Sequence, residues 1–261
     1  MKIIKIFSAV MLFSLLPCTA IAGETSSFFK GLRNDLSDNY QQFYASDNLS
    51  WLGSTLALGG VMANTRIDQK FQAFYNESIR SSTTDEIARI AKMLGDREIV
   101  LLYAGLTAYN RLYCDDRDCG RIPEWGDRTL RAILTGLPAV WLSQALLGGA
   151  RPHNGDSKWT LFRFDKMHAV SGHSFIGAVP FLTAAQMTDN DASKAILYSL
   201  STLTALSRIN DQKHYLSQAL MGWMYAAKVT DELYIPLNPG ESVVLPYADD
   251  DSVSLTWVKS F

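Results

Sequence analysis

The sequence of 261 residues predicts an all-α protein: a helical bundle with a short C-terminal tail that forms a β-hairpin. Two observations predict this fold. Apolar residues recur at helical spacing in one segment after another up to Leu233. Beyond that point Pro236 and Pro239 interrupt the chain, and the segments 242–245 and 253–258 have the composition of strands. We expect the resulting hairpin to lie on the bundle.

The helices expected before the tail share apolar residues at i, i+3 and i+4 spacing. A short amphipathic segment at 39–43 precedes them, and a capping box at 82–86 opens the helix at 87–94, which ends at Gly95 and Asp96. The expected helices are 68–79, 87–94, 129–149, 171–187, 193–207 and 211–229. The apolar run 51–63 is expected to form a buried helix or a loop and a helix, and 98–109 is another apolar segment.

The segment 129–149 is a long, mostly apolar stretch in which Arg131 is the only charged residue, and Arg151 follows it. Its length is close to the roughly 20 residues that a bilayer-spanning helix requires. Gly136, Pro138 and Ser143 make it less apolar than a typical span. The sequence therefore favours a buried helix over a membrane span.

The first 22 residues have the three-part layout of a secretory signal. Lys2 and Lys5 precede an apolar stretch, and a small-residue segment ends at Ala22, after which we expect cleavage. A lipoprotein signal at Cys18 is the alternative, but Pro17 stands where a small residue should precede the lipidated cysteine. The sequence thus predicts export to the periplasm.

The rest of the chain contains no Gly/Ser-rich or Pro-rich linker that would divide it. We therefore expect one helical domain over 23–232, with the tail 233–261 packed on it. Removing Lys2 and Lys5 with the signal changes the formal charge from −2 to −4, which is too small to imply a nucleic-acid partner. The moderate hydrophobicity allows a soluble protein or one that rests peripherally on a membrane.

Cys114 and Cys119 bracket a polar loop. In an exported protein such a close pair indicates a disulfide. A zinc site is the weaker alternative, because four ligands are usual and no second cysteine or histidine pair lies nearby.

Three short segments contain residue types suited to binding and transferring a phosphoryl group. They are Arg151-Pro152, Ser171-Gly172-His173, and Ser207-Arg208 followed after five residues by His214. Arginine offers a planar fork of donors to phosphate oxygens, and a helix that starts at Gly172 presents backbone N–H groups to the same anion. Two histidines can divide the roles of nucleophile and acid.

These segments resemble the motifs of the type 2 phosphatidic acid phosphatase superfamily, which includes bacterial class A acid phosphatases and vanadium haloperoxidases. The family pattern is Lys-x6-Arg-Pro, Pro-Ser-Gly-His, and Ser-Arg-x5-His-x3-Asp. The three segments match it in order and spacing, with Val170 in place of the second motif's proline. The resemblance covers 144–218 firmly and implies a helical bundle of this family's type.

The resemblance also implies a mechanism that needs no metal or other cofactor. His214 attacks phosphorus to form a phosphohistidine, and His173 protonates the leaving group and then activates water. The phosphoryl oxygens are held by four residues: Arg151, Ser171, Gly172 and Arg208. The implied partner is a phosphorylated small molecule or lipid.

Two positions depart from the family pattern. Gln144 stands in place of the lysine, and Gln218 in place of the aspartate that orients the nucleophilic imidazole. The Gln218 carbonyl, one helical turn from His214, could orient the ring without a charge. The lost charges could instead be replaced from Asp211 or from one of Lys158, Lys166 and Lys213.

Each of these residues also has a purely structural interpretation. A lone histidine on an apolar helix is usually a core residue, and Arg151 or Arg208 could pair with Asp165, Asp189 or Asp211. His153 and His168 match no family position. Three functions therefore stay open: a phosphatase acting on monoesters or on lipid or isoprenoid phosphates, a catalytically silent phosphate- or lipid-binding protein, and a vanadium haloperoxidase.

Overall fold

The computed structural model describes residues 22–114, 119–233, 242–248 and 253–259. The expected signal segment 1–22 therefore lies almost wholly outside the described residues. The chain forms two compact units, residues 1–34 and 35–261. Of the first unit the structure describes 22–34, the N-terminal part of helix α2 (Ala22–Phe43), where the rings of Phe28 and Phe29 meet edge to face at 5.0 Å.

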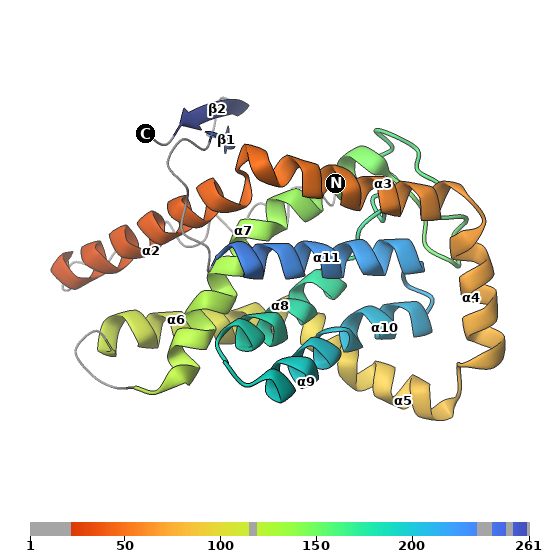
Figure 1. Ribbon diagram of the computed structural model, residues 1–261, viewed down its shortest axis with the longest axis horizontal. Coiled ribbons are helices and arrows are strands. Elements are labelled where there is room, and N and C mark those ends of the chain that lie inside the picture. Colours follow the sequence, from red (N-terminus) through yellow and green to blue (C-terminus); the bar gives the residue numbers. More distant parts are fainter. Residues whose placement is uncertain (1–21, 115–118, 234–241, 249–252, 260–261) are drawn as a thin grey trace. The chain divides into compact units, whose positions relative to one another are not determined.

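The second unit is helical, as the sequence predicts, apart from one hairpin (Figure 1). Strand β1 (Ser242–Ala248) pairs antiparallel with β2 (Val253–Lys259), with Ser242 opposite Lys259. The hairpin confirms the strand character expected of the tail. The helices after α2 are η2 (Ser46–Asn48), α3 (Leu49–Asn64), α4 (Ile67–Ser78), α5 (Ser82–Ala91), η3 (Lys92–Gly95), η4 (Arg97–Ile99), α6 (Val100–Tyr113), α7 (Arg121–Leu147), α8 (Gly172–Gln186), α9 (Asp191–Ser201), α10 (Leu203–Asn210) and α11 (Leu216–Glu232).

Helices α8 and α11 form the centre of this unit (Figure 1). They pack against each other, and both also contact α7 and α10. The side chains at their interfaces are large, apolar and fully buried, as the sequence composition of these helices requires. They include Ile133, Phe175, Leu182, Tyr225 and Val229.

Several predicted helices have different boundaries in the structure. The helix expected at 129–149 begins at Arg121, because the charged residues of its first turns are paired with neighbours. The helix expected at 193–207 is broken at Thr202 into α9 and α10. The helix expected to begin at 211 begins at Leu216. The capping box of α5 is formed by Ser81 and Thr84, one residue earlier than expected.

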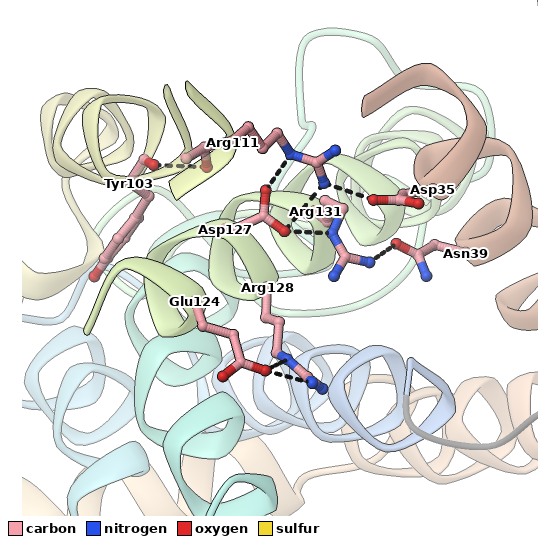
Figure 2. Close-up of polar contacts among 9 residues, drawn as sticks. Asp35, Asn39, Tyr103, Arg111, Glu124, Asp127, Arg128 and Arg131 are labelled. Carbon is pink, nitrogen blue, oxygen red and sulfur yellow. Dashed lines mark hydrogen bonds and ion pairs between the residues drawn. The ribbon is translucent and has the colours of Figure 1, made fainter. Parts of the chain in front are cut away.

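Ion pairs hold the N-terminal half of α7 (Figure 2). Asp127 accepts hydrogen bonds from Arg111 on α6 at 2.5 Å and from Arg131 at 2.9 Å. The same guanidinium groups reach Asp35 and Asn39 on α2. Asp127 is only 4% exposed, so its charge is compensated by these two arginines.

Within the described residues, one helix, α7, has the length and hydropathy of a membrane-spanning segment. In its most apolar window of 18 residues, 44% are buried against other helices. Near its C-terminal end, Trp141 and Leu142 are about half exposed. The preference for a buried helix over a span therefore stays a prediction.

The disulfide expected from the sequence joins Cys114, at the end of α6, to Cys119, with their Cα atoms 5.6 Å apart.

Candidate active site

Arg151, the arginine of the first motif, follows soon after the end of α7. The helix stops at Gly148, and both Gly148 and Gly149 have positive φ angles, 73° and 90°, which glycine adopts without strain. The reversed chain brings Arg151 back toward the bundle, where its carbonyl accepts a hydrogen bond from the Asn154 N–H. The Nε of Arg151 is buried and has no hydrogen-bond partner among the described residues.

The second motif forms the N-terminus of α8. Ser171 is the N-cap, and its hydroxyl accepts a hydrogen bond from the Ser174 N–H at 3.2 Å. The N–H groups of Gly172 and His173, in the first turn, lack intrahelical acceptors, as at any helix start. They supply donors and a positive dipole end for an anion.

Gln144, at the lysine position of the family pattern, forms a hydrogen bond with the backbone. Its Nε2 donates a 2.6 Å hydrogen bond to the Val170 carbonyl, immediately before the N-cap of α8. A Cβ added at Gly172 would lie 3.8 Å from this Nε2, so the side chain does reach the helix start. Gln144 thus holds the second motif in place and brings no charge to it.

His173 has a carboxylate partner that sequence reasoning missed. Its Nε2 lies 3.3 Å from Oδ1 of Asp96, which follows η3. The approach is close: a Cβ at Gly95 would stand 2.5 Å from the His173 carbonyl oxygen, so only glycine fits there. Burial and the charge of Arg208 lower the pKa of His173, whereas the Asp96 carboxylate raises it.

Arg208 and His214 are joined by one tight turn. Arg208 is in the last turn of α10, and its carbonyl accepts hydrogen bonds from the N–H groups of Lys213 and His214, at 2.9 and 3.1 Å. Gln212 has a positive φ of 52° within this turn. The turn explains the five-residue spacing between Arg208 and His214, and it explains why α11 begins later than expected.

The guanidinium of Arg208 is only partly compensated. The side chain of Arg208 is 10% exposed, and its Nε is buried without a partner among the described residues. The nearest carboxylate is Asp211, 3.7 Å from Nη1. Asp211 therefore faces the arginine, while the ring of His214 is held by another residue.

That residue is Gln218. Its Oε1 lies 3.1 Å from Nδ1 of His214 and also accepts the Tyr215 N–H, while its Nε2 donates to the Ala150 carbonyl at 2.8 Å. Because these partners fix which end of the amide is oxygen, Nδ1 of His214 must be the donor. Nε2 of the neutral ring then keeps a free lone pair.

Gln218 also joins the three motifs to one another. Its side chain bonds to Ala150, next to Arg151, and to His214, and its backbone carbonyl accepts the Ser171 N–H at 2.9 Å. Gln218 is fully buried. Gln218, one of the two glutamines that depart from the family pattern, therefore connects the three motifs of the candidate site.

His214 is buried, and its environment keeps it neutral. Burial lowers the pKa of His214 to about 3, and the positive charges of Arg151, Arg208 and His168 act in the same direction. The hydrogen bond with Gln218 opposes them. Because Arg151 and Arg208 also lower the pKa of His173, both guanidinium groups lie near both rings.

A second carboxylate that sequence reasoning missed, this one buried, supports the start of α11. Asp68 on α4 is fully buried and accepts hydrogen bonds from the N–H and the hydroxyl of Ser217, at 2.9 and 2.6 Å. Since Ser217 precedes Gln218, this contact fixes the helix turn from which Gln218 reaches His214.

The remaining histidines lie beside the site. The ring centroid of His168 is 6.2 Å from that of His214, and burial lowers the pKa of His168. His153 is exposed, and its Nδ1 is 2.9 Å from the Gln212 carbonyl.

Comparisons with known proteins concern the family and the fold. The family model of the PAP2 superfamily matches residues 131–234, a region that contains all three motifs. The fold is similar to the crystal structure of a transmembrane PAP2-type phosphatidylglycerolphosphate phosphatase from Bacillus subtilis. The two share 16% sequence identity with a TM-score of 0.50, over 71% of this chain and 92% of the other. No curated protein matches the chain.

The match at 131–234 supports the resemblance to the PAP2 superfamily that the sequence motifs predicted.

Proposed function

We propose that this protein is a metal-independent phosphatase that hydrolyses phosphate monoesters or lipid or isoprenoid phosphates through a phosphohistidine at His214. The observation that carries the proposal is the state of His214: a buried, neutral imidazole whose Nδ1 donates to Gln218 and whose Nε2 is free to attack. The match to the family model of the PAP2 superfamily supports a phosphatase-type hydrolase.

The substrate's phosphoryl group is bound by cations and helix donors. Arg151 and Arg208 each have a buried Nε without a partner among the described residues, and such groups are costly unless a ligand satisfies them. The N–H groups at the start of α8 supply further donors. A phosphate oxyanion meets both needs, and the same donors stabilise the charge that develops in the transition state.

The reaction then proceeds in two steps. Nε2 of His214 attacks phosphorus, the bond to the leaving oxygen breaks, and protonated His173 gives its proton to that oxygen. In the second step neutral His173 takes a proton from water, the hydroxide attacks phosphorus, and the N–P bond breaks. Phosphate leaves, and both histidines return to their starting states.

The structural comparison suggests which substrates to test. The protein from Bacillus subtilis that shares the fold is described as a phosphatidylglycerolphosphate phosphatase. A lipid phosphate therefore belongs in the substrate panel beside an isoprenoid phosphate and a soluble monoester.

A silent phosphate- or lipid-binding protein is the second candidate, because Gln144 and Gln218 replace two charged residues of the family pattern. Both amides are used to hold the backbone. Such a protein would bind phosphate at Arg151 and Arg208 without transferring it.

An assay of inorganic phosphate release distinguishes the two candidate functions. The mature chain is assayed with a chelator present on phosphatidic acid, an isoprenoid diphosphate and p-nitrophenyl phosphate. We expect turnover by the wild type and a loss of at least about 10³-fold in His214→Ala. His153→Ala, which changes an exposed histidine, is the matched control and should retain activity. Binding of phosphate without any release would favour the silent protein.

A further inference from the structure

The loop between Arg151 and Ser171 exposes three large apolar side chains in four consecutive residues. Leu161, Phe162 and Phe164 are 60%, 63% and 62% exposed. Single exposed apolar residues are common on protein surfaces, and this protein has many on its helices. A cluster of three at the tip of a loop is unusual and indicates a contact surface.

The backbone holds this loop in a fixed conformation. The N–H groups of Thr160 and Phe162 donate to the carbonyls of Leu147 and Leu146, at 3.0 and 2.9 Å, which caps the C-terminal end of α7. Phe162 has a φ of 59°, a left-handed conformation that is uncommon for a bulky residue. Strain of this kind persists only where the surroundings enforce it, and it is concentrated at functional sites.

The exposed surface continues onto the helix that the loop caps. Leu142 and Leu146, one turn apart on the same face of α7, are 51% and 37% exposed. Leu146 is also the residue whose carbonyl binds Phe162. We call this set the apolar platform: Leu142, Leu146, Leu161, Phe162 and Phe164.

Cations flank the apolar platform. Residues 151–170 contain four Lys or Arg residues and two Asp residues, although the whole chain has a formal charge of −2. Arg163 pairs with Asp165. Lys158 and Lys166 have no ion-pair partner among the described residues. Apolar side chains that project beside free cations match the chemistry of an anionic lipid surface.

The apolar platform is connected to the candidate site at both ends. The loop that carries it begins at Arg151 and ends at Ser171, which caps the helix start proposed to bind phosphate. We propose that the apolar platform docks on the surface of an anionic phospholipid bilayer. Docking then brings a lipid phosphate headgroup to Arg151 and to the start of α8. This consequence rests on the proposed phosphatase function.

Docking is tested by vesicle binding of the full mature chain. Co-sedimentation is measured with phosphatidylcholine vesicles that contain or lack phosphatidylglycerol. We expect the wild type to bind the anionic vesicles, and Phe162→Ser/Phe164→Ser to bind them at least about tenfold more weakly. Lys158→Gln/Lys166→Gln leaves the apolar tips in place and should weaken binding only to the anionic vesicles.

The matched control changes equally exposed apolar residues elsewhere. Leu101 and Leu102, on α6, are 71% and 55% exposed, and Leu101→Ser/Leu102→Ser should bind vesicles as the wild type does. Thermal unfolding of each variant verifies that it is folded. The proposal is overturned if the wild type does not bind vesicles, if folded Phe162→Ser/Phe164→Ser binds as well as the wild type, or if the α6 variant loses binding equally.

Activity measurements separate docking from catalysis. Phe162→Ser/Phe164→Ser should hydrolyse soluble p-nitrophenyl phosphate at the wild-type rate and lose about tenfold in kcat/KM on phosphatidic acid in vesicles. An equal loss on both substrates would contradict the docking role. If the wild type hydrolyses neither substrate, the phosphatase proposal fails, while vesicle binding still decides whether the apolar platform docks.

Discussion

At His214, one hydrogen bond determines which ring nitrogen keeps its lone pair. The Gln218 carbonyl accepts from Nδ1, so the lone pair of the neutral ring is at Nε2. A carboxylate in this position would add negative charge behind the ring, but it could not donate to the Ala150 carbonyl as the Gln218 amide does. The site has thus exchanged electrostatic support for a second structural bond.

Substitutions at Gln218 should separate these two effects. Gln218→Met removes both bonds, so the Nδ1–H loses its acceptor, and we expect kcat to fall by about 10²-fold. Gln218→Glu keeps the length of the side chain and adds a charge. The carboxylate raises the pKa of His214 from about 3, so the acid limb of the pH–rate profile moves to higher pH.

The measurement is the pH dependence of kcat/KM, with urea unfolding to record stability. Gln218→Glu places a carboxylate oxygen against the Ala150 carbonyl, and we expect a loss of about 1–3 kcal/mol in the free energy of unfolding. An unchanged acid limb in Gln218→Glu would show that Gln218 does not govern the protonation of His214.

At the scale of the elements, the 3-10 helix η3 (Lys92–Gly95) contributes a residue to the candidate site that none of the motifs contains. This residue is Asp96, which follows η3. The close approach of Gly95 to the first turn of α8 carries the Asp96 carboxylate to the ring of His173. The carboxylate raises the pKa of His173 against the effect of burial. It therefore increases the fraction of His173 that is protonated and able to act as an acid.

Asp96→Asn should lower the pKa of His173 further. A general acid loses activity as the pH rises through its pKa, so the alkaline limb of the pH–rate profile should move to lower pH. The loss should be large for an alkyl phosphate, whose leaving oxygen needs a proton, and small for p-nitrophenyl phosphate. Glu86→Gln, an exposed acid on α5, is the control. An equal loss on both substrates would point to a structural role for Asp96.

The sequence predicted the residues whose chemistry is local in the chain. The motif residues and the cysteine pair were found because each motif spans only a few positions. Asp96 and Asp68 were missed because their partners, His173 and Ser217, are far along the sequence and only the packing of helices brings them together. A lone aspartate beside a helix end gives no signal of such a partner.

The predicted helix boundaries were wrong where polar groups bond outside the regular pattern of the helix. Asp127 and Arg131 interrupt the apolar pattern, yet they belong to α7 because Arg111 and Asn39 pair with them (Figure 2). The start of α11 was expected too early because the N–H groups of Lys213 and His214 bond to the Arg208 carbonyl instead of continuing a helix. Arg111 and Asn39 are far from their α7 partners in the sequence, and the turn after Arg208 has no apolar pattern that marks it.

In the molecule as a whole, the ion pairs that stabilise the fold around Asp127 are separate from the residues of the candidate site. The ion-pair network around Asp127 lies about 30 Å along α7 from the turn that carries Arg151. It joins the three helices α2, α6 and α7 (Figure 2). Changes there should affect folding and leave the site intact.

Asp127→Asn leaves the largely buried side chains of Arg111 and Arg131, which are 14% and 15% exposed, with Asp35 as their one remaining carboxylate. We expect a loss of about 3 kcal/mol in the free energy of unfolding, measured by urea denaturation, with kcat/KM unchanged at a temperature well below the transition. Glu124→Gln, which breaks the more exposed pair with Arg128, should cost less than about 1 kcal/mol. A fall in kcat/KM of folded Asp127→Asn would contradict this separation.

The most direct test of the phosphatase account is to trap the covalent intermediate. The wild type and His173→Ala are mixed with p-nitrophenyl phosphate, quenched rapidly under alkaline conditions and examined by peptide mass spectrometry. We predict a phosphoryl group on His214 that accumulates in His173→Ala, because that variant lacks the base that activates water. Turnover of substrate without any phosphoryl group on His214, or with one on another residue, would contradict the account.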